Sequence, residues 1–177
     1  MKYLNNNRIL SFAIFSSLVF ILYITFILSR VSGCFTLDVG SNSLGLSFYY
    51  TKDMVQNFFE LRNQGQLLCY SKFLRIWDVF FALVYTLMYV SWIAYFLKNK
   101  TILLIIPILA MVCDWSENYT EILMMDTYLV SRSISERLVL LGSGINSFKW
   151  IFASLTYLLI IGGIIFSVKN FFTKSNK

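Results

Sequence analysis

The stretch TILLIIPILAMVCDWSENYTEILMM, residues 101–125, is long enough to cross a bilayer as a helix, yet several polar side chains lie inside it. Spacings of three, four and seven residues place Asp114, Glu117, Asn118 and Glu121 on one face of that helix. Each charged side chain at mid-membrane depth costs about 2.5–3.5 kcal/mol. We therefore predict that this face turns away from lipid and toward other helices of a bundle.

Other segments of the chain are also long and apolar enough to span a membrane, at residues 9–29, 76–97 and 148–168. The chain is 58% hydrophobic and only 14% charged, whereas a soluble domain is about half apolar and a quarter charged. Its 177 residues leave room for one compact unit. We predict an all-α, polytopic membrane four-helix bundle that forms a single membrane domain over residues 1–177.

The sizeable segment outside the predicted spans is the loop at residues 30–75. Within it, TKDMVQNFFELRNQG begins with a candidate cap at Thr51 and carries apolar side chains at helical spacing before Gly65. This pattern predicts a short amphipathic extramembrane helix that lies on the membrane surface or caps the bundle. After Gly65 we expect the chain to continue as helix directly into the second span.

Basic residues set the expected orientation. One side of the bundle carries no acid and the following bases: Lys2, Arg8, Lys98, Lys100, Lys169, Lys174 and Lys177. Positive residues in short loops next to spans stay on the cytoplasmic side, so we expect both termini there, in a cell (inner) membrane. The net charge of +6 is scattered between apolar runs, which favours the lipid bilayer as partner and argues against nucleic acid.

The chain contains no histidine, which removes the commonest general base and zinc ligand. Its three cysteines have no metal-ligand spacing, and phosphate-binding glycine loops are absent, so we expect no cofactor. A metal would have to be an oxygen-ligated Mg²⁺ or Mn²⁺. Cys34 and Cys69 fall near the outer end of the bundle, where a disulfide and two unpaired apolar side chains both fit the sequence.

The polar face of the third span has expected partners at similar depth. Arg75 and Asp78 begin the second span and Lys149 begins the fourth. Deeper tyrosines can reach Asp114, namely Tyr85, Tyr89 and Tyr157. Because acids outnumber bases in this cluster, we expect at least one carboxyl group to keep its proton at neutral pH.

These positions form the candidate site. Asp114 and Glu117 are the candidate proton-transfer residues, which would be catalytic if the site supports a reaction. The candidate ligand-binding residues are Arg75, Asp78, Tyr85, Asn118, Glu121 and Lys149, with Arg75 or Lys149 as the contact for an anion.

The motif D-x-x-E-N, here Asp114, Glu117 and Asn118, resembles that of small four-helix integral membrane proteins found mainly in bacteria. In those proteins a Gly and then a Tyr precede an Asp at the head of the second span, and another Tyr follows two turns deeper. The corresponding positions here are Gly65, Tyr70, Asp78 and Tyr85, and Lys149 lies early in the fourth span as in that group. The resemblance covers most of the chain and implies a four-helix fold with these polar positions, without implying an activity.

Three functions remain open from the sequence. The first is binding, with or without chemical processing, of a lipid-like or small polar ligand in a partly protonated intramembrane site. The second is a structural or assembly subunit, in a homodimer or a membrane complex, whose polar network only fixes helix register. The third is a proton-coupled carrier, for which four spans would require a dimer.

Overall fold

The protein is described by a computed structural model that covers residues 6–38, 43–97 and 100–175. Within these ranges the chain is helical and contains no strand. The main helices are α1 (Asn6–Leu22), α2 (Ser29–Ser32), α3 (Lys52–Glu60), α4 (Gln64–Lys72), α5 (Val79–Phe96), α6 (Ile105–Ser131) and α7 (Glu136–Ser175). Two wide π-helical turns, Tyr23–Leu28 and Phe73–Asp78, join α1 to α2 and α4 to α5. Short 3₁₀ turns lie at Leu44–Leu46 and Thr101–Leu104.

Four continuous helical segments are long and apolar enough to cross a membrane: Asn6–Ser32, Gln64–Phe96, Thr101–Ser131 and Glu136–Lys169. The predicted all-α bundle is therefore confirmed, and the expected helix from Gly65 into the second span is present. Three helices contain their predicted spans entirely, and the second ends one residue short, at Phe96. The helices also run well beyond the predicted spans at one end, where the rest of the chain packs against them.

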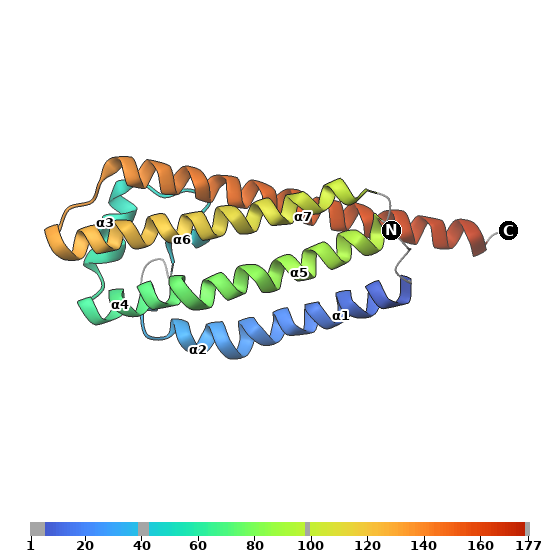
Figure 1. The fold of residues 1–177 in the computed structure, drawn as a ribbon, viewed down its shortest axis with the longest axis horizontal. Helices are drawn as coiled ribbons and strands as arrows, with labels where there is room; N and C mark the ends of the chain where they lie inside the picture. Colours follow the sequence, from blue (N-terminus) through green and yellow to red (C-terminus); the bar gives the residue numbers. More distant parts are fainter. Residues whose placement is uncertain (1–5, 39–42, 98–99, 176–177) are drawn as a thin grey trace.

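Helix α5 is central to the bundle (Figure 1). Helix α1 packs along one side of α5, while α6 and α7 pack along each other and both contact α5. Packing between α1 and α7 is not extensive over the described residues. Helix α1 begins and α7 ends at the same end of the bundle, and α3 and α4 lie at the opposite end.

Residues 33–38 and 43–63 fold over that opposite end, which we call the capped end (Figure 1). The Thr51 hydroxyl accepts a hydrogen bond from the Met54 amide at 3.3 Å and starts α3, as its sequence predicts. Val55, Phe58 and Phe59 are buried in a core with residues of α4, α6 and α7. The amphipathic helix therefore caps the bundle, which was one of the two placements expected.

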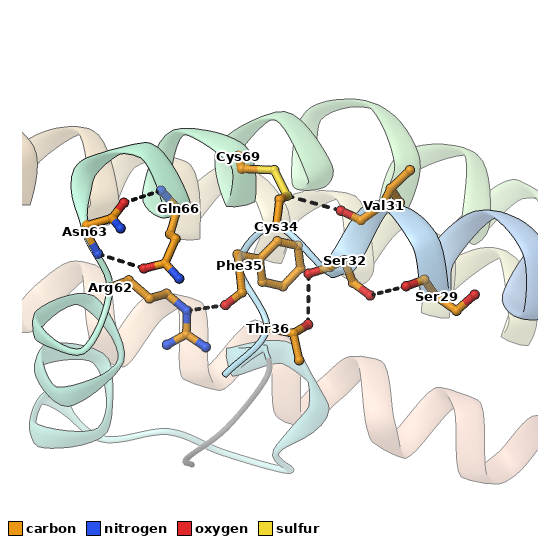
Figure 2. The surroundings of a disulfide bond; sticks show 10 residues. All are labelled: Ser29, Val31, Ser32, Cys34, Phe35, Thr36, Arg62, Asn63, Gln66 and Cys69. Atoms are coloured by element: carbon orange, nitrogen blue, oxygen red, sulfur yellow. Dashed lines mark hydrogen bonds between the residues drawn. A yellow bond between two sulfur atoms is a disulfide. The ribbon is translucent and has the colours of Figure 1, made fainter. Parts of the chain in front are cut away.

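A disulfide between Cys34 and Cys69 ties the chain after α2 to α4, with their Cα atoms 6.3 Å apart (Figure 2). The sequence left open whether these cysteines pair, and the structure pairs them. The loop between them ends at Asn63, whose side chain accepts from the Gln66 amide while the Gln66 side chain accepts from the Asn63 amide. The buried Arg62 guanidinium donates to the Phe35 carbonyl at 2.9 Å, so a hydrogen bond within the segment between the two cysteines adds to the disulfide.

The two wide turns matter because they disturb the regular helical hydrogen bonding and leave backbone carbonyls for other partners. The Tyr23 hydroxyl, in the first turn, donates to the Trp77 carbonyl in the second at 2.8 Å. The Trp115 indole donates to the Val79 carbonyl at 3.2 Å, just after the second turn. Side chains of α6 and of the turn after α1 are thus hydrogen-bonded to backbone carbonyls around the start of α5.

Candidate functional site

The polar face predicted for the third span faces the interior of the bundle. Asp114, Glu117, Asn118 and Glu121 on α6 are all buried, with between 1% and 5% of each residue exposed. Tyr119, which points away from them on the same helix, is 63% exposed. The insertion cost of acids in a membrane helix explains this arrangement, because neighbouring helices supply the partners that lipid lacks.

Lys149, on α7, is the cation among these groups. Its ammonium forms an ion pair with the Glu117 carboxylate and a second one, at 3.3 Å, with Asp114 Oδ1. It also donates to the carbonyl oxygen of Gly45 at 3.1 Å. Both acids and the lysine are largely buried, so the pairs are shielded from solvent and hold α6 against α7.

Helix α5 and the turn before it supply the next partners. The Tyr85 hydroxyl donates to Asp114 Oδ2 at 3.0 Å, as the sequence predicts. The Asn118 amide donates to Asp78 Oδ2 at 2.8 Å. Through these two contacts the polar face of α6 is hydrogen-bonded to α5 as well as to α7.

At the capped end, Glu121 accepts a hydrogen bond from the Tyr70 hydroxyl at 2.5 Å. Tyr70 is fully buried, and its hydroxyl also bonds the Ser43 hydroxyl at 3.0 Å. The carboxyl group of Glu117, one turn away, lies within hydrogen-bonding reach of Glu121. Glu117 Oε1 is buried and receives no hydrogen bond from an N–H or O–H group of the described residues. Two carboxyl groups can bond each other only through a shared proton.

The loop before α3 closes the site from the capped end. The carbonyl of Gly45 accepts hydrogen bonds from Lys149 and, at 3.1 Å, from the Trp150 indole. A Cβ at Gly45 would lie 3.0 Å from Glu117 Oε1 and 3.1 Å from Lys149 Nζ. Glycine at this position therefore lets the backbone approach the ion pair closely.

Tyr50 anchors the end of the same loop. Its amide donates to the Ser143 hydroxyl at 3.0 Å, and its side chain is buried against Gly142 and Thr120. Burial raises the pKa of Tyr50 far above its usual value, and the negative charges of Glu121 and Glu117 add to the effect. The phenol is therefore neutral across the physiological range.

These groups surround a cavity of about 250 Å³. Its polar wall contains Asp78, Tyr85, Asp114, Asn118, Glu121 and Lys149. Its apolar wall includes Phe20 of α1, Leu46 of the loop, Phe81 of α5 and Ala153 of α7. The cavity joins an acidic, hydrogen-bonding surface to an aromatic and aliphatic one, which is a suitable environment for an amphipathic molecule.

Arg75 is the predicted site residue that the structure does not bring to the cluster. Its guanidinium pairs with Asp126 at 3.3 Å, and both side chains are more than half exposed. In a regular helix, Arg75 and Asp78 would share a face because they are three residues apart. The wide turn Phe73–Asp78 changes that angular relation, and Arg75 turns outward instead.

The other candidate residues do converge, and some further residues join them. Of the deep tyrosines, only Tyr85 bonds Asp114; Tyr89 and Tyr157 bond each other, hydroxyl to hydroxyl, at 2.5 Å. The residues absent from the predicted site are Ser43, Gly45, Tyr50, Tyr70 and Trp150. Tyr70 already belonged to the pattern of the resemblance, which was the one signal for it. The loop residues carry no local motif, and only the folded chain brings them to Lys149.

Within the described ranges, no group of three or more Cys, Asp or Glu side chains is placed to hold a metal ion. No family model, curated protein or solved structure matches the chain.

Proposed function

We propose that this chain is an integral membrane protein that binds the polar head of a lipid-like or small polar molecule between its helices. The observation that carries this proposal is the cavity of about 250 Å³ in which buried acids meet an apolar wall. Ligand pockets in proteins are commonly about 300–1,000 Å³. The cavity is slightly smaller than that range, so it suits a head group with only the first part of a chain. A network that only fixed helix register would need no cavity beside it.

The charges around the cavity support a bound group. Among the described residues of the site, the buried carboxyl groups of Asp114, Glu117 and Glu121 and the partly buried one of Asp78 accompany a single ammonium, that of Lys149. Burying unbalanced charge is costly, so protons or a bound group must compensate the surplus. The site that we propose is partly protonated in the absence of a ligand, and the ligand replaces some of those protons.

Chemical processing of the ligand stays within this proposal, and the geometry ranks the two candidate proton-transfer groups. Asp114 lines the cavity and is positioned by Tyr85 and Lys149. Glu117 does not line the cavity and lies behind the Lys149 ammonium and the Gly45 backbone. Of these two, Asp114 is therefore the residue able to exchange a proton with a bound molecule.

A purely architectural network is the second candidate, and one observation favours it. Each acid on the polar face has a partner from another helix: Tyr85 and Lys149 for Asp114, Lys149 for Glu117, and Tyr70 for Glu121. Such contacts stabilise membrane bundles by about 0.6–2 kcal/mol each. The cavity distinguishes the two functions, since filling it harms a binding site but leaves an architectural network intact.

We also propose that the capped end faces away from the cytoplasm in a cell (inner) membrane. The disulfide between Cys34 and Cys69 lies at the capped end, and disulfides persist in oxidising compartments. The segments that carry Arg8, Lys100 and Lys169 lie at the opposite end, in agreement with cytoplasmic termini. They are the start of α1, the chain just before the turn Thr101–Leu104, and the far part of α7. Of the other bases used for this orientation, Lys2, Lys98 and Lys177 lie outside the described residues.

The variant Ala153→Phe tests binding, because it fills the apolar wall without removing a polar group. Leu158→Phe is the matched control, since Leu158 lies on the same helix and is 64% exposed. Wild-type and variant proteins would be purified from membranes in a mild detergent, and the small molecules that they release would be compared by mass spectrometry. We expect a species enriched with wild type and with Leu158→Phe to be lost from Ala153→Phe.

The architectural function predicts a different pattern. Ala153→Phe would then release the same molecules as wild type, and its thermal stability would stay equal or rise because a void is filled. Asp114→Asn and Glu117→Gln complete the comparison, since both would lower stability if their network is needed only to hold the helices. Equal release from all proteins would exclude the binding function.

A further inference from the structure

The N–H donors of the Lys149 ammonium already have acceptors within the protein. An ammonium group carries three N–H donors, and three acceptors surround this one: Glu117, Asp114 and the Gly45 carbonyl. The lysine side chain is only 13% exposed. An anionic head group in the cavity would therefore have to break an existing ion pair to reach it.

The remaining polar wall offers acceptors and negative charge. Among the described residues that line the cavity, Lys149 is the single cation, whereas Asp78, Asp114 and Glu121 line it with carboxyl groups. Arg75, the other cation considered for an anion contact, pairs with Asp126 on the surface. A phosphate or carboxylate would face this acidic wall with its one lysine already paired, while a cation would find several acceptors.

Aromatic rings reinforce the preference for a cation. The rings of Phe81, Tyr85, Tyr89, Trp150 and Tyr157 line the cavity. An ammonium group over an aromatic face gains about 0.5–2 kcal/mol, and more when it is desolvated. Carboxylates together with aromatic faces are the surroundings in which proteins hold amine cations.

The apolar wall indicates where a chain would lie. Phe20 on α1 and Ala153 on α7 both line the cavity. These two helices do not pack extensively against each other over the described residues, because α1 packs on α5. An alkyl chain held against Phe20 and Ala153 would therefore lie at the boundary between α1 and α7.

We propose that the cavity holds a primary ammonium head group, and that the alkyl chain attached to it leaves between α1 and α7. This inference rests on the proposed binding function and adds the charge and the path of the ligand. A free long-chain amine and an aminophospholipid such as phosphatidylethanolamine both present this group. Dodecylamine is the simplest probe that carries it.

The test compares four probes with the same chain length and different heads: dodecylamine, dodecyltrimethylammonium, dodecanol and dodecyl phosphate. The protein would be held in a neutral detergent, where matched chains partition similarly, and binding followed by the saturable rise in unfolding temperature. We expect dodecylamine to bind at least tenfold more tightly than dodecanol. Dodecyltrimethylammonium should be weaker than the amine because it has no N–H donors, and dodecyl phosphate should not shift the temperature.

Variants separate the head group from the cavity. Asp78→Asn keeps the shape of a lining side chain and removes a negative charge, so it should weaken dodecylamine about tenfold and leave dodecanol unchanged. Glu121→Gln provides the same comparison if Asp78→Asn does not fold. Ala153→Phe should abolish binding of every probe, and Leu158→Phe should abolish none.

The outcomes distinguish the inference from the function beneath it. If dodecyl phosphate or dodecanol binds as tightly as dodecylamine, the ammonium assignment is wrong while the binding function stands. If no probe shifts the unfolding temperature, or if Ala153→Phe has no effect on the shifts, both are wrong. With binding established, displacement of dodecylamine by phosphatidylethanolamine but not by phosphatidylcholine would assign an aminophospholipid, and no displacement by either would assign a free amine.

Discussion

The two ends of the bundle are built differently. The capped end contains a large buried core in which Phe35, Phe59, Leu67 and Met124 are at most 1% exposed, and the Cys34–Cys69 disulfide crosslinks it. The other end, away from the cap, has a small core of Ala82, Tyr85 and Tyr89, and its helices expose apolar side chains along most of their length. The polar site lies where the two meet.

This difference follows from the two solvents. In lipid, apolar side chains need not be buried, so helices there associate through packing and hydrogen bonds. In the membrane placement proposed above, the capped end extends out of the hydrocarbon, where water would drive Phe58 and Tyr128 into the core that they share. The structure should therefore depend on the hydrophobic effect at the capped end and on polar contacts deeper in the bundle.

The largest expected effect comes from Lys149→Met, which removes the cation that joins α6, α7 and the Gly45 carbonyl. It leaves Asp114 and Glu117 buried without their counter-charge, and breaking a buried pair in this way costs about 3–5 kcal/mol. Chemical denaturation in detergent, followed by circular dichroism, would measure the loss. If the polar contacts, rather than the core of the capped end, hold the spans together, this loss of stability should be the largest among the variants proposed here.

Two further variants make this test specific. Lys169→Met removes a lysine from the exposed far part of α7 and should leave stability unchanged. The double variant Lys149→Met/Glu117→Gln should recover part of the loss, because one uncompensated charge is removed with the cation. A Lys149→Met protein as stable as wild type would show that the network contributes little to the fold.

The disulfide gives the next largest effect, and it tests the capped end alone. Cys34 and Cys69 are 35 residues apart, and closing a loop of that length stabilises a protein by about 3–4 kcal/mol in the chain-entropy model. The loss of this stabilisation should lower the unfolding temperature. The shift should be the same in Cys34→Ser/Cys69→Ser and in the reduced wild type. Cys113→Ser is the control, since Cys113 is a free thiol on α6.

Limited proteolysis would locate the effect of that change. With the disulfide removed, we expect cleavage within residues 33–63 to accelerate, while the four membrane-crossing helices stay protected. Simultaneous cleavage throughout the spans would contradict the separation of the two ends.

A smaller effect is expected at the contact between the ends. Gly45→Ala would place a methyl group 3.0 Å from Glu117 Oε1 and 3.1 Å from Lys149 Nζ, so the loop or the ion pair must shift. Overpacking of this kind costs about 1–3 kcal/mol. Gly144→Ala is the matched control: a Cβ there meets nothing within 4 Å, and the helix should gain up to about 1 kcal/mol. Equal thermal unfolding of both variants would show that Gly45 is not held against the site.

The sequence was most informative where lipid restricts the choices. Apolar length alone predicted the membrane-crossing helices, and the cost of buried acids predicted that Asp114 and Glu117 face inward. Helical spacing then brought Asn118 and Glu121 to the same face, and similar depth suggested Asp78, Tyr85 and Lys149 as neighbours. These inferences need only the period of a helix and the polarity of its surroundings.

The sequence was least informative where the capped end meets the bundle. The approach of Gly45 to Lys149 depends on the path of a loop without a motif, because the contact joins residues 104 positions apart. The pairing of Cys34 with Cys69 could be proposed but not chosen over unpaired thiols, since it depends on how the loop returns to α4. Long-range contacts of irregular segments carry no periodic signal.

Arg75 shows the same limit inside a helix, and it gives the smallest expected effect. Its sequence position predicted the depth of Glu117 and Glu121, but the wide turn Phe73–Asp78 points it toward Asp126 on the surface. Exposed ion pairs contribute about 0.2–1 kcal/mol, so Arg75→Ala should change stability by no more than that and leave dodecylamine binding unchanged. Loss of binding in Arg75→Ala, with stability preserved, would place the guanidinium at the cavity after all and would restore an anionic head group as a candidate.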